Sequence, residues 1–436
     1  MIQAVVSRLH CQRAAALASI FVLFAPGFRL VADVNVVAAE RVAPALPKIP
    51  KRTFLLTDFG AVPDGRALNT DAFRRAVAAV ARAGGGQLVV PTGVYRTRPF
   101  ELCSNLELAL ESGAVIMAPG SFQEYGLPDP STVRSQAELD AAVGSPSPLI
   151  SGRHLHDVAI TGEGAIDGEG ALWWAWSERA ARGRPGRLVI RRPNLVVIED
   201  CARLLVTRIT LRNSPKFHLV PRSITDLTID GVIVRAPADA PNTDGIDPGP
   251  VTNAVVRRCD VDTGDDDIVI KSGGTNILIE DCRVKHGHGI SIGSGTSAGV
   301  NGMLVRRCTF EGTDNGIRIK SMRGAGGLVE NVRYTDIRMR DVGDAIVLDL
   351  TYVDNNRPNF RGGAEMIPAI RGVLIDHVTI DYAKRAGRII GLPESRITGV
   401  TLRDATIAAG EDFVIKDAEP PVFERVAKTI GGAGMN

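Results

Sequence analysis

Three aspartates stand side by side at Asp265, Asp266 and Asp267, within the stretch TGDDDIVIKSG. Carboxylates held this close repel one another. The repulsion raises the pKa of at least one of them, so that one can stay protonated while a neighbour is ionised. Glycoside hydrolysis uses such a pair, because one carboxyl group protonates the leaving oxygen while the other activates water or attacks. The run therefore raises the hypothesis of a proton-transfer site.

Two other interpretations of the run involve turns and metals. An aspartate in a turn bonds backbone amides and tolerates left-handed backbone, and we interpret Asp267 in this way. A calcium site would need ligand spacing such as D-x-D-x-D-G, which the run lacks. A zinc site would need convergent ligands such as C-x-x-C, which the sequence also lacks. We therefore expect no metal and no cofactor.

A repeat in the second half of the chain predicts where these residues lie. Short alternating patterns such as RRCDVDTG, EDCRVKHG and RRCTFEGT recur, with a small or apolar residue at the matching place in each. No helix of useful length fits inside a repeat, so the pattern predicts an all-β parallel β-helix with one coil per repeat. We interpret the repeated thiols as reduced core residues, with a disulfide as the alternative. The matching positions are Ile209, Val232, Cys259, Cys282, Cys308, Ile337, Val378 and Ala405.

A second column of the repeat collects the polar residues. Each coil has a turn that leads into a strand headed by isoleucine, at Ile246, Ile268, Ile290, Ile317 and Ile346. Two residues before these stand Asp244, Asp266, His288, Asn315 and Asp344. Asp244, Asp265, Asp266 and His288 should therefore converge on three adjacent coils. Arg318 and Lys320 share one face of the next strand and would suit a substrate that carries carboxylates, such as a uronate polymer.

At these motifs the sequence resembles the polygalacturonases of glycoside hydrolase family 28, in a bacterial-type form. The blocks NTDGID, TGDD, GHGISIGS and RIK occur in the family's order, and TDFGAVPDG, IDGEGALWW and NSP extend the likeness over nearly the whole chain after its N-terminal leader. The resemblance implies a single-stranded right-handed parallel β-helix. It also implies metal-free hydrolysis, with inversion, of the α-1,4 linkages between galacturonates in pectic polysaccharides or oligogalacturonides.

The resemblance also implies catalytic roles by motif position. Asp265 would be the general acid. Asp244 and Asp266 would hold and deprotonate the water, and His288 would tune the acid.

Substrate-binding roles follow in the same way. Arg318 and Lys320 would bind a galacturonate carboxylate, Asn242 would order the site or contact sugar, and Tyr352 would contact substrate. Endo or exo action stays open, as does a preference for galacturonan over rhamnogalacturonan or xylogalacturonan.

Two other functions remain as alternatives. A pectate lyase shares the β-helix but would need calcium and a basic arginine, and the RIK and GHG blocks favour hydrolysis. A non-catalytic solenoid that binds pectic glycans belongs to another class of protein, and the retained carboxylates disfavour it.

The N-terminus predicts export. Arg8 and Arg13 precede the apolar run AAALASIFVLFA, which is too short to span a bilayer and is typical of a signal peptide. We expect a signal peptide over residues 1–39 and a periplasmic or extracellular protein, with an uncleaved anchor as the alternative. Without residues 1–39 the chain has 48 basic and 48 acidic residues, which gives no reason to expect nucleic-acid binding. We expect a monomer with no stable membrane association.

The remaining organisation is that of a single domain. We expect a linker over residues 40–52, a β-helix over 53–415 and a tail over 416–436. The stretch NTDAFRRAVAAVARAGGG predicts a short capping helix at the N-terminal end of the β-helix. Thr70 should cap this helix and the glycines at 84–86 should end it. Its apolar face comprises Phe73, Ala76, Val77 and Val80.

Overall fold

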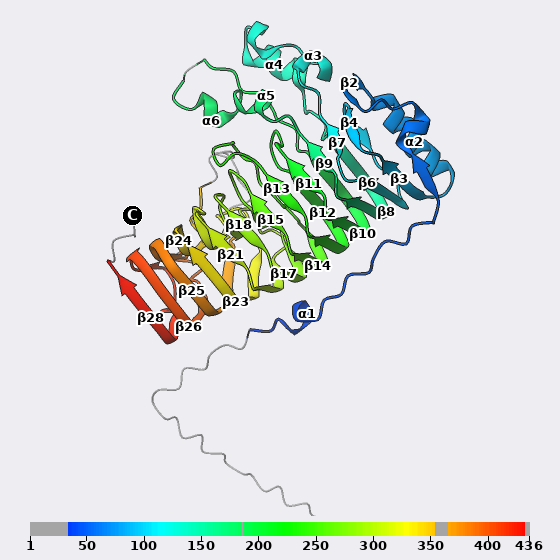
Figure 1. Cartoon of the computed structure of the whole chain (residues 1–436). Helices are drawn as coiled ribbons and strands as arrows, with labels where there is room; N and C mark the ends of the chain where they lie inside the picture. Colours follow the sequence, from blue (N-terminus) through cyan, green and yellow to red (C-terminus); the bar gives the residue numbers. More distant parts are fainter. Residues whose placement is uncertain (1–33, 185, 354–364, 432–436) are drawn as a thin grey trace, which may run out of the picture. The chain divides into compact units, whose positions relative to one another are not determined.

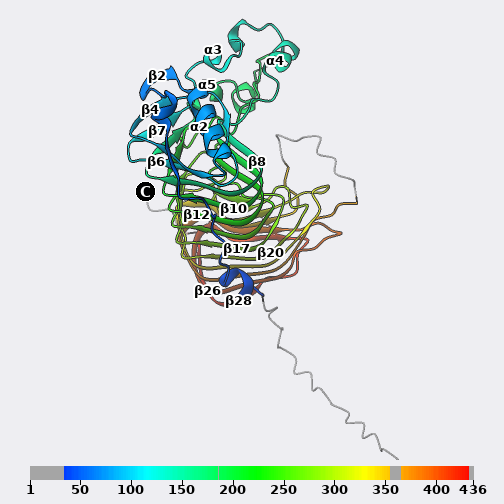
Figure 2. The same cartoon turned by 90° about the vertical axis from the view of Figure 1, so that its right-hand side faces the viewer.

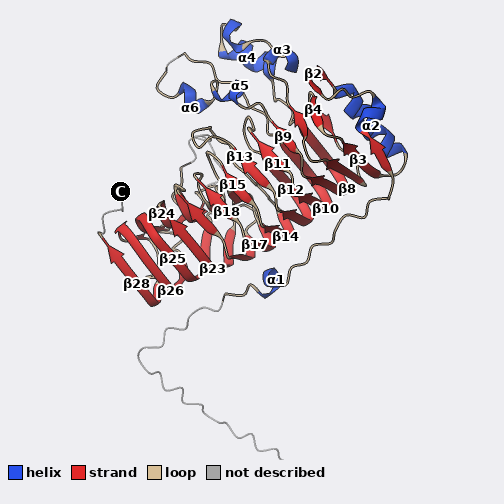
Figure 3. Ribbon diagram, viewed as in Figure 1, coloured by secondary structure: helices blue, strands red, loops and turns tan. Residues whose placement is uncertain are grey.

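A computed structural model describes residues 34–184, 186–353 and 365–431. In this part of the chain the strands wind into a parallel β-helix, in which each coil stacks on the one before (Figures 1, 2 and 3). The predicted fold class is therefore confirmed. Among the described residues, no helix has the length and the apolar character needed to cross a bilayer.

Three ladders of parallel strands form the coils. The first is made of β1 Thr53–Leu55, β3 Gly86–Val90, β6 Leu106–Leu110, β8 Ile150–Gly162, β10 Val196–Thr207, β12 Leu219–Asp230, β14 Val251–Arg257, β17 Gly274–Glu280, β20 Val300–Arg306, β23 Leu328–Arg340, β25 Ala369–Ile390, β26 Thr398–Glu411 and β28 Val422–Ile430. The second is made of β2 Asp64–Leu68, β4 Gly93–Arg96, β7 Ala114–Met117, β9 Ala165–Asp167, β11 Thr210–Arg212, β13 Ile233–Arg235, β15 Asp260–Asp262, β18 Arg283–Lys285 and β21 Thr309–Glu311. The third contains β5 Phe100–Glu101, β16 Ile268–Ile270, β19 Ile290–Ile292, β22 Asn315–Lys320, β24 Val342–Asp349 and β27 Val414–Lys416.

The columns predicted from the sequence run through the core of the coils. The isoleucine column is in register, with Ile246 bridged to Ile268, Ile268 paired with Ile290, and Ile290 paired with Ile317. The cysteine column is buried as well, and all five cysteines among the described residues are free thiols. The interpretation as reduced core residues is therefore confirmed.

A two-residue turn joins the first ladder to the second in coil after coil. Its first residue has left-handed backbone, as at Arg208 with φ 57°, Arg258 with φ 53° and Arg307 with φ 52°. The second residue of the turn is the buried residue of the cysteine column, as with Cys259 and Cys308. Because the same turn recurs in successive coils, the buried residue recurs at the same place in each repeat of the sequence.

The predicted capping helix is present as α2 Thr70–Arg82, packed against the first coils (Figures 1 and 2). Its predicted apolar face is buried, and the ring of Phe73 stacks on that of Phe100 at 4.5 Å between centroids. The helix ends at glycines as predicted, because Gly84 adopts φ 77°. The predicted cap was wrong: the Thr70 hydroxyl accepts a hydrogen bond from the Arg98 amide, and Asn69 holds the cap position without a side-chain bond to the helix.

The other helices are short. They are α1 Val37–Glu40, η1 Leu56–Phe59, α3 Phe122–Tyr125, η2 Pro130–Thr132, α4 Gln136–Val143, α5 Ala171–Trp174 and α6 Glu178–Ala181. Helices α3 to α6 belong to two insertions that pack on each other, with Trp173 fully buried between Phe122 and Tyr125 in edge-on ring contacts. These insertions stand beside the coils that carry β9 and β11 (Figures 1 and 3).

The β-helix begins at its predicted start, with β1 at Thr53, and extends beyond its predicted C-terminal end. At the C-terminal end, β28 pairs with β26 through Ile430, so the prediction that the β-helix stops at residue 415 was wrong. At the N-terminal end, α1 lies against the outer face of β17 and β20. There the side chains of Val36 and Ala39 are buried against Val255, Leu278 and Leu304.

The packed chain therefore begins before the predicted signal peptide ends at residue 39. Residues 40–52, predicted as a linker, continue along the β-helix, where the Lys48 amide donates to Asp157 at 2.7 Å. The apolar core of the predicted leader, residues 14–25, lies outside the described residues.

Replacing Ala39, which is fully buried, by aspartate should weaken this contact. The free energy of unfolding is expected to fall by about 1–3 kcal/mol, because the carboxylate must either be buried unpaired or displace α1. Urea unfolding of the purified protein measures the change. Val37→Asp is the matched control, since Val37 on the same helix is 51% exposed. Equal losses in the two variants would contradict the packing of α1.

Candidate active site

The register of the third ladder brings the predicted polar residues together. Asp244 and Asp266 occupy equivalent positions two residues before the paired Ile246 and Ile268, and His288 follows on the next coil. The coils are also joined by main-chain bonds at this place, since the Gly245 amide donates to the Asp266 carbonyl at 2.8 Å. The predicted convergence on three adjacent coils is therefore present.

Asp266 is the most strongly paired carboxylate of the cluster. Arg318 donates to its Oδ1, Lys320 Nζ lies 2.9 Å from its Oδ2, and the Ser291 hydroxyl donates to Oδ1 at 3.1 Å. Burial disfavours the charged form of Asp266, but the two cations outweigh this effect and hold its pKa far below the usual value. Asp266 is therefore ionised throughout the ordinary pH range.

Asp265 is paired with His288. Its Oδ1 lies 3.2 Å from His288 Nδ1, and its Oδ2 accepts a hydrogen bond of 3.3 Å from Asn242. The other ring nitrogen of His288 lies 3.3 Å from Asp314 Oδ2. Burial opposes the charge on His288, yet its bonds to Asp265 and Asp314 raise its pKa to about 10. In the same way burial opposes the charge on Asp265, and His288 holds its pKa below the usual value.

Asp244 is a carboxyl group of the cluster whose pKa rises. It is almost completely buried, and burial raises its pKa well above the usual value against the pull of Lys271. Lys271 Nζ lies 2.6 Å from Asp244 Oδ2 and 2.7 Å from Asp247 Oδ2. The Oδ1 atoms of Asp244 and Asp247 are buried without a hydrogen-bond partner in the described part of the chain. Within the predicted cluster the pKa thus rises at Asp244 and, as described below, at Asp267, whereas it falls at Asp265 and Asp266.

Glycines on both sides of His288 hold it in position. A Cβ atom on Gly287 would lie 2.2 Å from the Asp265 carbonyl oxygen, and Gly289 adopts φ 73° with its Cα facing the Asn315 carbonyl. No residue with a side chain fits such close main-chain approaches. The GHG block thus fixes the imidazole against Asp265.

Asp267 lies behind the cluster and holds the turn. It is fully buried, with its carboxylate accepting from the Gly289 amide at 2.9 Å and from the Thr263 hydroxyl at 3.2 Å. Burial raises the pKa of Asp267 well above the usual value. These bonds agree with its interpretation as a turn residue, although the turn is buried.

Arg318 and Lys320 border the carboxylates as expected. Their exposed fractions are only 7% and 6%, and Lys320 Nζ lies 5.1 Å from the centroid of the Tyr352 ring. Asp265, Asp266 and His288 approach one another closely enough to ligate one metal ion. Both oxygens of Asp266 are bonded to these cations, however, and their charge repels a metal, so the donor set fits a metal poorly.

Comparisons with known proteins place this site in a family. Residues 124–419 match the model of the glycosyl hydrolases family 28. A probable polygalacturonase of Vitis vinifera is 32% identical over 371 residues, which make up 81% of this chain and 73% of the grape protein. The chain belongs to glycosyl hydrolases family 28.

Further relatives extend this family assignment. An endo-polygalacturonase of Pectobacterium parmentieri is 31% identical over 277 residues, which make up 60% of this chain and 66% of the Pectobacterium protein. The crystal structure of an exopolygalacturonase from Thermotoga maritima matches with a TM-score of 0.77 at 27% identity, over 91% of this chain and 96% of that one. The coils are right-handed, as in these neighbours. Plant and bacterial relatives are about equally similar, so the comparisons show the family and not the bacterial type.

Two charged residues of this family 28 site, Lys271 and Asp247, were not predicted from the sequence. Lys271 stands three residues after Ile268, as Lys320 stands three residues after Ile317. Asp247 directly follows Ile246, as Arg318 follows Ile317. The isoleucine column therefore contains the signal for both residues, at the positions that Arg318 and Lys320 hold after Ile317.

A third missed residue, Arg192, connects the insertions to the site. It is 9% exposed and donates to the carbonyls of Pro215 and Pro241 and, at 2.7 Å, to Asn242 Oδ1. Asn242 in turn donates to Asp265. Its left-handed backbone, with φ 53°, is one that asparagine tolerates. Arg192 thus orients the amide that faces Asp265, and nothing in the repeat signals it because it lies outside the strands.

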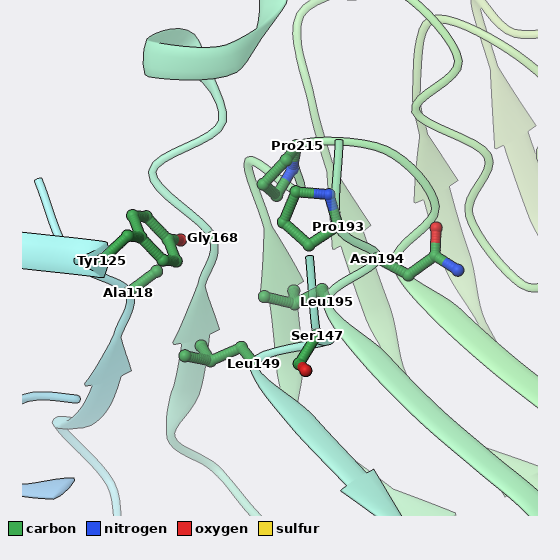
Figure 4. Close-up of a pocket in the computed structure, with 9 residues that line it drawn as sticks. All are labelled: Ala118, Tyr125, Ser147, Leu149, Gly168, Pro193, Asn194, Leu195 and Pro215. Atoms are coloured by element: carbon green, nitrogen blue, oxygen red, sulfur yellow. The ribbon is translucent and has the colours of Figure 1, made fainter. Parts of the chain in front are cut away.

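A shallow hollow lies beside Pro215, whose carbonyl accepts a hydrogen bond from Arg192 (Figure 4). Ala118 and Tyr125 come from the first insertion, and Pro193, Asn194 and Pro215 come from the coils that follow. The hollow therefore lies between the first insertion and the coils that follow it.

Proposed function

We propose that this chain hydrolyses α-1,4-galacturonosyl linkages in pectic polygalacturonate or oligogalacturonides, with inversion at the anomeric carbon. The observation that carries the proposal is the Asp265–His288 pair, which holds a proton beside the ionised Asp266 and the cations Arg318 and Lys320. An acid, a base and a receptor for a sugar carboxylate thus lie in one place, as hydrolysis of a uronate polymer needs.

Asp265 is the proposed general acid, and its proton comes from the shared pair. Over the neutral range the pair carries one proton, because the pKa of His288 is about 10 and that of Asp265 is lowered. A bound sugar excludes water, and in a drier site transfer of the proton from His288 to Asp265 removes two opposite buried charges. The neutral carboxyl group then protonates the leaving oxygen.

Asp244 and Asp266 are the proposed activators of the water. Asp266 starts as a weak base, since Arg318 and Lys320 neutralise it. A galacturonate carboxylate that binds these cations competes with Asp266 and raises its basicity, so substrate binding prepares the base. Asp244, kept next to Lys271, can accept a proton that Asp266 cannot keep.

The remaining residues are proposed to position the substrate. Arg318 and Lys320 bind a carboxylate, Tyr352 beside Lys320 packs against a sugar ring, and Asn242 orients Asp265 or contacts a hydroxyl group. Family membership favours hydrolysis over the elimination of a pectate lyase. We further propose a metal-free, bacterial-type, exported monomer, periplasmic or extracellular, that does not bind nucleic acid or stay on a membrane.

Asp265→Asn is expected to lower the hydrolysis rate of polygalacturonate by about 10²–10⁴-fold, the usual loss when a general acid is removed. New reducing ends measure the rate, and chromatography of the products separates endo from exo action. Asp239→Asn is the matched control, since Asp239 is exposed on the loop before Asn242. Calcium-dependent unsaturated products, saturable binding without turnover, or an unimpaired Asp265→Asn enzyme would each overturn the proposal.

The stereochemistry gives an independent prediction. A water activated by Asp244 and Asp266 attacks from the face opposite the leaving oxygen, so the first product should be the β-anomer. Proton NMR during the first minutes of hydrolysis records the anomer before mutarotation. An initial α-anomer would mean retention and would require a covalent intermediate instead.

Lys320→Met is expected to shift the pH dependence of kcat/KM. Loss of the cation raises the pKa of Asp266, and activity requires this group ionised. As the pH falls, the variant should therefore lose activity at a higher pH than the wild type, because without Lys320 the pKa of Asp266 moves up toward its usual value. Lys428→Met, which removes a lysine paired with Asp412 in the last coils, should leave the profile unchanged.

A further inference from the structure

The coil before Asp244 presents a lysine, Lys216, that has no part in the reaction described above. This coil is held against the site, since Leu219 bridges Ile246 and the His218 amide donates to the Asp244 carbonyl at 2.8 Å. Lys216 stands three residues before Leu219, as Asp265 stands three residues before Ile268. Lys216 therefore belongs to the column of Asp265, two coils earlier.

The surroundings of Lys216 combine an aromatic ring and two cations with the more distant carboxylates of Asp244 and Glu178. Its Nζ lies 4.9 Å from the centroid of the Phe217 ring, and Lys271 Nζ lies 3.9 Å from the same ring. Arg192 donates to the carbonyl of Pro215, which directly precedes Lys216 and lines the hollow of Figure 4. Lys216 thus shares its neighbourhood with two other positive side chains.

Those two cations are hydrogen-bonded to side chains or carbonyls of the chain, whereas the interaction of the Lys216 ammonium with the described residues is that with the Phe217 ring. Lys271 is bonded to Asp244 and Asp247, and Arg192 to two carbonyls and Asn242. Within residues 34–184, 186–353 and 365–431, the Lys216 ammonium has no hydrogen bond and no carboxylate at ion-pair distance. Burial, together with repulsion from Arg192, lowers the pKa of Lys216. A half-buried ammonium in this setting gains most from an incoming anion.

We propose that Lys216 binds a second carboxylate of the uronate chain, on the side of the catalytic carboxylates opposite to Arg318 and Lys320. Four coil steps, or roughly 19 Å of strand spacing, separate the Lys216 coil from the Arg318 coil. A polymer with one carboxylate on every sugar can reach both cationic ends while a linkage between them lies at Asp265. This inference rests on the proposed function, because it takes the uronate polymer as the ligand.

Lys216 is a specificity-determining residue and not a catalytic one. It makes no contact with Asp265 or Asp266, so its bond to the sugar is present in the ground state and persists in the transition state. Loss of such uniform binding raises KM and leaves kcat unchanged. A purely structural role through the Phe217 ring would instead change stability and would not depend on the charge of the substrate.

The test measures binding in the absence of turnover. Calorimetry with purified oligogalacturonates of increasing length compares Asp265→Asn with Asp265→Asn/Lys216→Gln. The added change is expected to weaken binding of the longer oligomers by about 10-fold, the usual range for a charge-assisted hydrogen bond. The two variants should bind digalacturonate, which occupies only the Arg318 and Lys320 end, with equal affinity. They should also bind fully methyl-esterified oligomers with equal affinity. Lys216→Arg should restore the affinity.

Lys51→Gln serves as the control for loss of one positive charge, since Lys51 is exposed ahead of β1. Equal affinities with and without Lys216 at every length would overturn the inference, as would an equal loss for the methyl ester. Absence of oligogalacturonate binding while Lys216 is intact would overturn it too. A wild-type protein that fails to hydrolyse galacturonan, yet binds it through Lys216, would remove the proposed function and leave this binding site standing.

Discussion

In-register stacking of parallel strands is the constraint on which this molecule depends. Each coil copies the position of the last, so residues that lie more than twenty positions apart in the sequence become neighbours across one strand spacing. The stacking explains why Asp266 can meet Arg318 and Lys320, two coils away, without any loop reaching across. A slip of one residue in any of these coils would turn the charged side chains into the apolar core.

The charges of the site are arranged so that each carboxylate has a different environment. Asp266 faces two cations, Asp265 faces an imidazolium, and Asp244 shares Lys271 with Asp247. Burial acts on all three in the same direction, so the partner decides the outcome: the pKa of Asp244 rises while those of Asp265 and Asp266 fall. Three similar side chains on neighbouring coils can therefore take three different parts in one reaction.

Periodicity made much of this arrangement predictable. The cysteine and isoleucine columns gave the β-helix and the convergence of Asp244, Asp266 and His288, because both columns follow from strand alternation alone. The partners of these residues were harder to foresee. Arg192 lies in irregular chain, and the order of the pKa values depends on burial and on distances of a few ångström, which spacing does not contain. The packing of α1 on β17 and β20 was missed because a signal-peptide pattern and a surface-covering segment run together in the sequence.

The two-residue turn between the first and second ladders has a consequence for how such a protein can change. It recurs unaltered at Arg208, Arg258 and Arg307, whereas every helical insertion from α3 to α6 interrupts the chain between the second ladder and the next coil. The helical insertions of the described residues thus lie along one flank, and the strands beneath keep their register. Loops of a different length on that flank could change which groups meet a ligand without moving the side chains held on the coils.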